Sequence, residues 1–138
     1  MHYYKQSEEM GQRNEVQCLP FIKAHLGMEL TSTDKFNTFD FVSVEKKVLV
    51  ELKSRTCKKD KYPTTMIGMN KVLKSQDLVR KGWEIYYYFK FTDGLYYIKY
   101  SNSLQYSVDK GFRNDRPETL RNPMPYAYIN VNLLTKVD

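Results

Sequence analysis

The segment Val48–Lys53, with the sequence VLVELK, constrains the fold of this chain more than any other stretch. Successive residues of a strand face opposite sides of a sheet, so Glu51 and Lys53 share one face. The apolar residues at the alternate positions, beginning with Val48, then face the other side, which we expect to be the core. A run of this kind predicts a central strand, and a charged pair within it indicates a specific role.

An alternating run over residues 36–44 precedes this strand, and the two runs meet around Glu45 and Lys46, which predicts a hairpin. With the hairpin centred between these two residues, Asp40 lies directly opposite Glu51, and the two carboxylates converge on one side of the sheet. Glu-Lys is a poor pair for a two-residue turn of the primed type, so a four-residue loop with the same centre is expected. A loop of odd length would instead place Asp40 out of phase.

Two opposed carboxylates destabilise a sheet, and a cation between them removes that cost. Magnesium and similar divalent cations prefer carboxylate and carbonyl oxygens, with water completing the coordination shell. Together with the ammonium of Lys53, the pair formed by Asp40 and Glu51 therefore suits a metal ion and an anionic phosphate. The alternative is an ordinary solvated strand face, on which Glu51 pairs with Lys53 or Lys47.

Periodicity predicts the other elements. A first helix is expected to end at Gly27, with Pro20 as a kink or a break, and a second helix covers 69–81 and ends at Gly82. Aromatic-rich strands are predicted at 83–91 and 95–100, joined by Asp-Gly, a loop at 58–63, irregular structure at 101–125 and a last strand at 126–134. The residues expected to face inward are Val16, Leu19, Ile22 and Leu26 in the first helix, and Val72, Leu73, Leu78 and Val79 in the second.

The length of 138 residues suits one domain over 1–138, with a core at about 7–101 and a C-terminal extension at 102–138. The formal net charge of +6 favours an anionic partner such as nucleic acid. Neither a secretory signal nor a membrane-spanning segment is recognisable, so an intracellular location without a membrane partner is expected. Cys18 and Cys57 lack the spacing of zinc ligands and are expected to be free thiols.

Asp40, followed after ten residues by Glu51-Leu52-Lys53, resembles the motif of the PD-(D/E)xK nuclease superfamily, in particular the small nucleases of phages and large DNA viruses. The resemblance extends to the segment Gly11–Glu15, where many members carry a further glutamate, and to Lys71. Phe39 stands where the motif has proline, a change that the family tolerates. The resemblance implies a restriction-endonuclease-like α-β-β-β-α-β core: a mixed α/β sheet flanked by helices, with an extended C-terminal tail that ends in a strand.

The resemblance also implies roles for individual residues. Asp40 and Glu51 would bind the metal, with the backbone carbonyl of Leu52 as a further ligand and Glu15 in its inner or outer shell. Lys53 would orient the attacking water and offset charge in the transition state. The cofactor would be Mg²⁺ or Mn²⁺, with no small-molecule cofactor. The residues expected to contact nucleic acid are Arg55, Lys58, Lys59, Lys61, Tyr62 and Lys71.

The function expected from these features is hydrolysis of phosphodiester bonds in DNA, with RNA as a possible substrate, by a metal-dependent endonuclease. A structure-selective junction resolvase is the nearest alternative activity. A nucleic-acid-binding module that kept the fold without catalysis, and a viral structural protein with an accidental resemblance, are alternatives of a different class. A homodimer is expected, because small members of the superfamily often pair to cut two strands.

Overall fold

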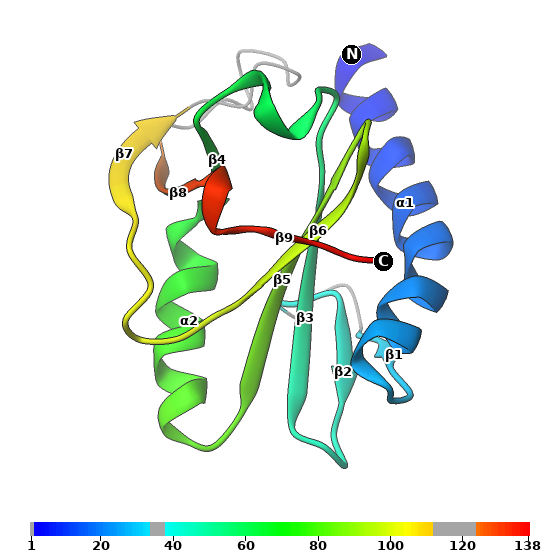
Figure 1. Ribbon diagram of the computed structural model, residues 1–138, viewed down its shortest axis with the longest axis vertical. Coiled ribbons are helices and arrows are strands. Elements are labelled where there is room, and N and C mark those ends of the chain that lie inside the picture. The colour runs from blue at the N-terminus through cyan, green and yellow to red at the C-terminus, as the bar shows by residue number, and fades with distance from the viewer. Residues whose placement is uncertain (1, 34–37, 112–123) are drawn as a thin grey trace.

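The structure is a computed structural model that describes residues 2–33, 38–111 and 124–138. Its main sheet has six strands in the order β1-β2-β3-β5-β6-β9, and a smaller sheet has the order β4-β8-β7 (Figure 1). β3 and β5 are parallel, while the pairs β2–β3 and β5–β6 are antiparallel. The helices are α1 (His2–Leu26) and α2 (Met69–Arg80); the strands are β1 (Thr31–Ser32), β2 (Phe41–Ser43), β3 (Val48–Ser54), β4 (Thr64–Gly68), β5 (Glu84–Phe91), β6 (Gly94–Lys99), β7 (Ser107–Gly111), β8 (Met124–Asn130) and β9 (Thr135–Lys136), with short 3₁₀ turns at Lys59–Lys61 and Val131–Leu133.

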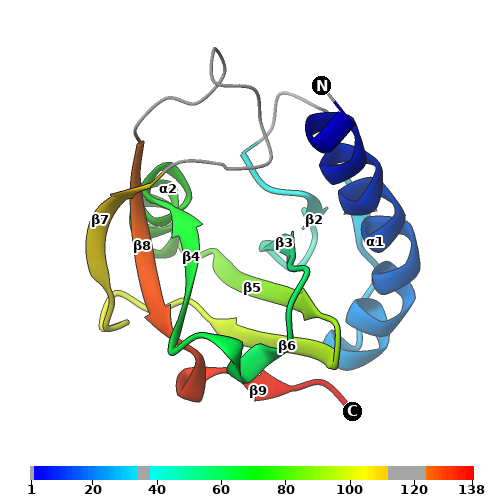
Figure 2. The same ribbon diagram turned by 90° about the horizontal axis from the view of Figure 1, so that it is seen from above.

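The main sheet is covered on both faces. Helix α1 lies on one side, and α2 with the smaller sheet lies on the other (Figure 2). Each face therefore has its own buried cluster: Ile22 of α1 contacts the cluster that holds Val50, whereas Val72 of α2 belongs to the cluster that holds Leu49. This arrangement is the mixed α/β fold with a restriction-endonuclease-like core that was expected.

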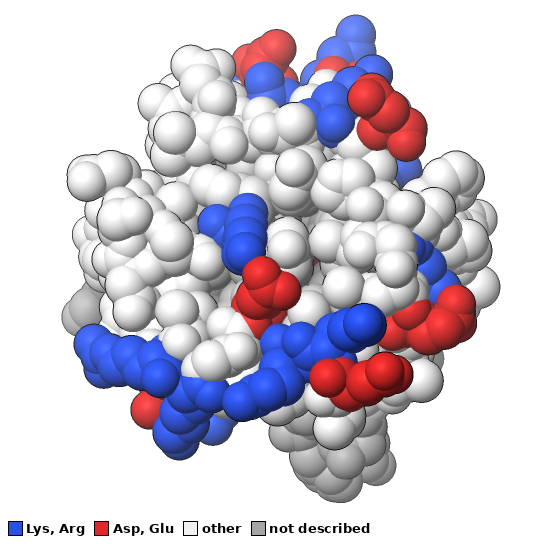
Figure 3. Space-filling view, turned by 60° about the horizontal axis from the view of Figure 1, so that its bottom comes forward, with Lys and Arg blue, Asp and Glu red and all other residues white. Residues whose placement is uncertain are grey.

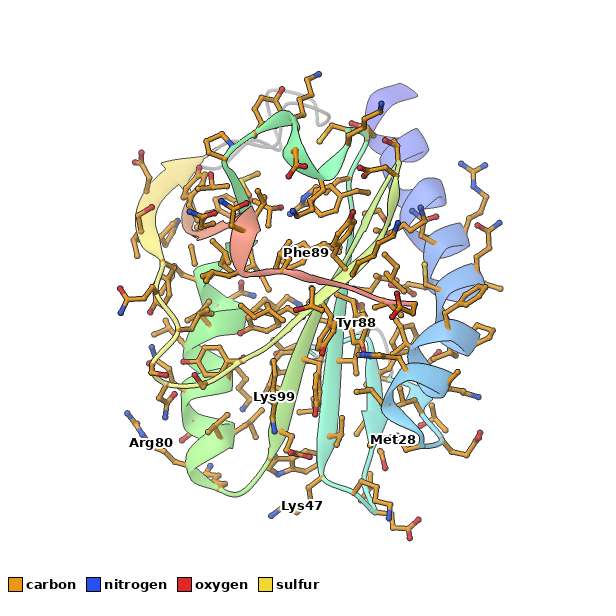
Figure 4. All side chains as sticks on the ribbon, in the orientation of Figure 1. Met28, Lys47, Arg80, Tyr88, Phe89 and Lys99 are labelled. Carbon is orange, nitrogen blue, oxygen red and sulfur yellow. The ribbon has the colours of Figure 1, made fainter. Side chains whose placement is uncertain are left out.

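The central strands are apolar because both of their faces are buried. In β5, Tyr88 points toward the α1 side and Phe89 toward the α2 side (Figure 4), and both side chains are fully buried. β3 alternates in the same way, so the apolar run that marks a central strand in the sequence is confirmed. The core is therefore on both sides of β3, and not only on the side that Val48 faces.

The boundaries of α2 are confirmed to within one residue, but the inward position of Leu73 is wrong, because its side chain is 57% exposed. The buried stripe runs through Val72 and Ser75, and Leu73 lies about 100° around the helix from Val72. Ser75 is buried despite its hydroxyl, because the hydroxyl hydrogen-bonds to the buried Tyr87 at 2.6 Å. Hydrophobicity alone gives no sign of such a partner.

Helix α1 ends at Leu26 as expected, but it continues through Pro20 as one helix. Proline lacks an N–H, so the Val16 carbonyl has no donor four residues on. Val16 is 76% exposed, which contradicts its expected inward position and leaves this carbonyl on a solvated turn. Cys18 occupies the buried side instead, and it is a free thiol, as is Cys57.

The smaller sheet was not predicted. β4 follows a lysine-rich loop and a proline, and β7 lies within the stretch that was expected to be irregular. The last long strand begins at Met124 and ends at Asn130, four residues earlier than expected, because the Asn130 side chain accepts a hydrogen bond from the Asn132 N–H and starts a 3₁₀ turn. The tail then adds β9 to the edge of the main sheet.

Gly27 is the position where the backbone most clearly requires glycine. Its φ is +67°, and its N–H bonds the Lys23 carbonyl at 2.8 Å to end α1. A Cβ at this position would meet nothing within 4 Å, so the cost of Gly27→Ala is purely conformational, about 1–2 kcal/mol of unfolding free energy. Urea unfolding measures the loss. Gly27→Asn should lose less, because asparagine tolerates this conformation, and equal stability of all three proteins would contradict the argument.

Candidate active site

The hairpin between β2 and β3 has the predicted centre, because Phe41 pairs with Val50 and Ser43 pairs with Val48. The loop has the four residues that were expected, 44–47, and its last residue has a positive φ of 56°. The paired positions end at Phe41. The Asp40 N–H donates to the carbonyl of Val50 at 2.9 Å, and Val50 is already the partner of Phe41. The predicted register is therefore confirmed from Phe41 to Ser43, and the backbone departs from it at Asp40, which stays beside β3.

Asp40 is anchored to the strand that carries Glu51. Its Oδ2 accepts the backbone N–H of Leu52 at 2.8 Å. Burial raises the pKa of the Asp40 carboxyl, the Leu52 hydrogen bond opposes that rise, and the nearby Glu15 carboxylate adds to it. Asp40 and Glu51 are close enough to hydrogen-bond when one of them carries a proton.

Glu51 is the most deeply buried charged residue of the site, with 1% of its surface exposed. Its pKa is raised to about 7: burial is the largest cause and the Asp40 carboxylate acts in the same direction, while the ammonium groups of Lys53 and Lys71 lower the pKa in part. Its Oε1 is buried and has no hydrogen-bond partner among the described residues. An ionised, under-coordinated oxygen of this kind is costly in a protein interior unless a cation contacts it.

Two lysines share the Glu51 carboxylate. The Lys53 ammonium is 3.1 Å from Oε2, and the Lys71 ammonium is 3.4 Å from Oε1. Lys71 reaches the carboxylate from α2, and its ammonium also donates to the Thr38 carbonyl and lies 5.9 Å from the centre of the Phe39 ring. The structure therefore brings Lys71 into the carboxylate pair itself, whereas the sequence indicated only a contact with nucleic acid.

Several supporting residues were missed by sequence reasoning. The Ser75 hydroxyl bonds the Lys71 carbonyl at 2.7 Å and the Tyr87 hydroxyl at 2.6 Å, and Tyr87 lies beside Glu51 in the β3–β5 register. On the other side, the Asn14 side chain of α1 donates to the Ser54 hydroxyl at 2.8 Å. The one signal in the sequence is a serine four residues after Lys71, in the middle of an amphipathic helix.

Glu15 is half-buried on α1 and lines a shallow pocket of about 280 Å³ between α1 and the β1–β2 edge. It is near enough to Asp40 to raise the pKa of that carboxyl. However, no group of three or more Asp, Glu, His or Cys side chains in the described ranges is arranged to hold a metal ion. The structure thus brings Asp40 and Glu51 together and leaves Glu15 near them, outside a three-carboxylate cluster.

The basic segment after β3 divides into two groups. The Arg55 guanidinium donates to the Thr65 hydroxyl and the Met66 carbonyl, and so connects β3 to β4. Lys59 pairs with Asp60 at 3.1 Å and lies over the Tyr96 ring. The exposed side chains are those of Lys58, Lys61 and Tyr62.

Basic residues also gather where α2 ends and the β2–β3 loop turns (Figure 3), a region in which Figure 4 labels Lys47, Arg80 and Lys99. Much of this charge is compensated locally. Lys99 pairs with Glu84 at 2.7 Å, Lys81 pairs with Asp77 at 3.0 Å, and the Lys47 ammonium donates to the Lys81 carbonyl. The positive charge of this region is therefore partly compensated by neighbouring groups, and it does not by itself mark the site.

A carboxylate pair held across a hairpin, with a lysine two residues after the second carboxylate on an α/β core of this order, defines the PD-(D/E)xK class of nucleases. The sequence matches the family described as "Phage putative PDDEXK endonuclease" over residues 2–137, and the chain belongs to this family. Neither the curated proteins nor the solved structures contain a match to the chain. No helix within the described residues is long and apolar enough to cross a membrane.

Proposed function

We propose that the chain is one nuclease domain over residues 1–138 that hydrolyses phosphodiester bonds in DNA as a metal-dependent endonuclease. The observation that supports this proposal is the proximity of three groups: Asp40 Oδ2 accepts the N–H of Leu52, next to Glu51, at 2.8 Å, and the Lys53 ammonium is 3.1 Å from the Glu51 carboxylate. The family supports it, since its description reads "putative PDDEXK endonuclease" and nucleases of the PD-(D/E)xK class generally use divalent metals.

The residues present fit a divalent cation. The buried Glu51 Oε1, which lacks a hydrogen bond from any described residue, would contact the cation. The cation would also offset the repulsion between the carboxylates of Asp40 and Glu51. We propose that Asp40 and Glu51 bind Mg²⁺ or Mn²⁺ with the Leu52 carbonyl, and that Glu15 contributes to the outer shell. When bound, the ion polarises the phosphoryl oxygen and lowers the pKa of its water.

The protein residues supply the remaining chemistry. Lys53 is 32% exposed at its side chain, so its ammonium can reach both the Glu51 carboxylate and an entering phosphate. In that position it would orient the attacking water and offset the negative charge that develops on the phosphoryl oxygens. Asp40 is held in place by the Leu52 N–H, so its carboxylate would be oriented as a metal ligand.

The DNA backbone is proposed to approach along the end of β3. Lys58 and Lys61 are exposed there, and Tyr62 is 57% exposed and offers a ring for stacking on a base. Arg55 bonds Thr65 and Lys59 pairs with Asp60, so both are proposed to attract the DNA backbone through their positive charge without direct contact. A homodimer, which would bring two sites to the two strands of a duplex, is part of the proposal.

The first test is cleavage of plasmid, linear, branched and single-stranded DNA, and of RNA, with Mg²⁺, Mn²⁺ or EDTA. We expect nicking of closed plasmid with either metal and none with EDTA. The loss of an outer-shell partner of a metal ligand costs roughly 10–100-fold, so Asp40→Asn should reduce the rate at least on the order of a hundredfold. Asp77→Asn is the matched control, because Asp77 is exposed on α2 and pairs with Lys81.

Each outcome of this test has a distinct meaning. Cleavage that survives both EDTA and Asp40→Asn would contradict the mechanism. Binding of DNA without cleavage by the wild-type protein would favour a non-catalytic module. Cleavage confined to the branched substrate would identify a junction resolvase in place of a general endonuclease.

A further inference from the structure

Lys71 makes the least expected contact of the site. It comes from α2, twenty residues after Glu51 in the sequence, and its ammonium is 3.4 Å from Glu51 Oε1. The contact is protected from solvent, since the side chains are 17% and 2% exposed. The atom that Lys71 contacts is the oxygen that has no hydrogen bond from any residue in the described ranges. Lys71 is therefore the nearest charge compensation for that oxygen.

The Lys71 contact occupies an oxygen that a metal ion would need. When Asp40 and Glu51 are ionised, the ammonium groups of Lys53 and Lys71 lie beside them, and Glu15 adds a third carboxylate near Asp40. A divalent cation bound to Glu51 through Oε1 would lie at short range from the Lys71 ammonium, and the two positive charges would repel each other. The contact between Lys71 and Oε1 must therefore lengthen or break when a metal binds at that oxygen.

Lys71 is the ammonium group that can move and keep other partners. Its other contacts are the Thr38 carbonyl and the face of the Phe39 ring, both in the segment that leads to Asp40. Lys53 has only Glu51 as an ion-pair partner among the described residues. The Ser75 hydroxyl fixes the Lys71 backbone through its carbonyl, so the side chain can shift while α2 stays in place.

We propose that Lys71 is a resident counter-ion of Glu51, which occupies its Oε1 in the metal-free protein and releases it when a divalent cation binds. This inference rests on the proposed function and deepens it, because it makes Lys71 a residue that sets the metal affinity of the site. Lys71 thereby opposes metal binding while it stabilises the buried carboxylate in the absence of metal. The released ammonium group stays beside Thr38 and Phe39, the two residues that precede Asp40.

The test measures Mn²⁺ binding directly, by titration calorimetry, for the wild-type protein and Lys71→Met. The removal of one unit charge at contact distance is worth on the order of a tenfold change in Kd or more, so we expect Lys71→Met to bind Mn²⁺ about tenfold more tightly. The titrations are run at pH 8.5, above the pKa of about 7 that Glu51 has in the wild-type protein. Lys81→Met is the control, since it removes the same charge from the other end of α2, and its Kd should stay within twofold of wild type.

A purely structural role for Lys71 predicts the opposite sign, because a loosened site binds metal more weakly. An unchanged or higher Kd for Lys71→Met would therefore overturn the inference while the proposed function stands. Absence of Mn²⁺ binding by the wild-type protein would overturn both. If Lys71→Met does not fold, Lys71→Gln is tested in the same way, and the rise in its unfolding temperature with added Mn²⁺ must exceed that of the wild type.

Discussion

Replacement of Glu51 by glutamine is expected to stabilise the metal-free protein at pH 8 and to abolish cleavage. Burial is the main reason that the Glu51 pKa rises from 4.5 to about 7, and this value already includes the favourable effects of Lys53 and Lys71. The ionised form is therefore less stable in the folded protein than in water by about 3 kcal/mol. Glutamine has the same shape without the charge, so Glu51→Gln should gain about 3 kcal/mol of unfolding free energy at pH 8.

The raised pKa of Glu51 also predicts how the unfolding free energy of the wild-type protein changes with pH. Between pH 4.5 and about 7 the folded protein keeps a proton on Glu51 that the unfolded chain has lost. Wild-type stability should fall as the pH rises through this window and level off above it. Burial also raises the pKa of Asp40, which contributes in the same direction. In Glu51→Gln the contribution of residue 51 is absent, and the slope should be smaller.

Urea unfolding in EDTA at pH 5, 6, 7 and 8 measures both effects. Glu84→Gln is the control: Glu84 is exposed and pairs with Lys99, so its replacement should change stability by less than about 0.5 kcal/mol. A Glu51→Gln protein that is less stable than wild type at pH 8 would show that the two lysine contacts outweigh the burial of the carboxylate. The lost cleavage is then measured on plasmid with saturating Mn²⁺.

Replacement of Lys53 by methionine is expected to reduce the single-turnover cleavage rate about 10²–10³-fold at saturating metal, the usual cost of losing one group that stabilises transition-state charge. Methionine keeps much of the apolar length of the side chain and removes only the ammonium group. Metal binding should persist, because the two carboxylates remain. A loss of rate with retained Mn²⁺ binding would separate the role of Lys53 from those of Asp40 and Glu51.

The assay for Lys53→Met is run at pH 8.5, because the loss of this ammonium group raises the pKa of Glu51 further and a protonated Glu51 would bind metal poorly. Lys99→Met is the matched control on β6, where the ammonium group pairs with Glu84 at 2.7 Å. Its cleavage rate should stay within twofold of wild type. A rate for Lys53→Met within threefold of wild type would remove Lys53 from the mechanism.

The sequence was sufficient to predict the hairpin, because strand alternation and an even loop leave one register, which pairs Phe41 with Val50 and brings Asp40 beside β3. It was insufficient to decide which face of each helix is buried against the sheet. Val16 and Leu73 have helical spacing with apolar neighbours, yet Cys18 and Ser75 occupy the buried positions. A small residue can fit against a crowded sheet where a larger one cannot, and this depends on tertiary contacts that periodicity does not encode.

The position of Lys71 could not be predicted for a related reason. Its ammonium group reaches Glu51 from α2, which packs on β5, the neighbour of β3, and on β4, and β4 was not predicted. Arg55 is similar: its sequence neighbours indicate a basic loop, but its guanidinium donates to β4. Positions within a single hairpin were predictable, and contacts between two distant elements were not.

The location of the site on β3 has a consequence for how the protein loses activity. β3 has β2 on one edge and β5 on the other, and it is buried on both faces. Amide hydrogens in such a strand exchange only when much of the domain opens. The backbone that carries Glu51 should therefore keep its place in the sheet until much of the domain opens. Heat inactivation and global unfolding should therefore share one midpoint.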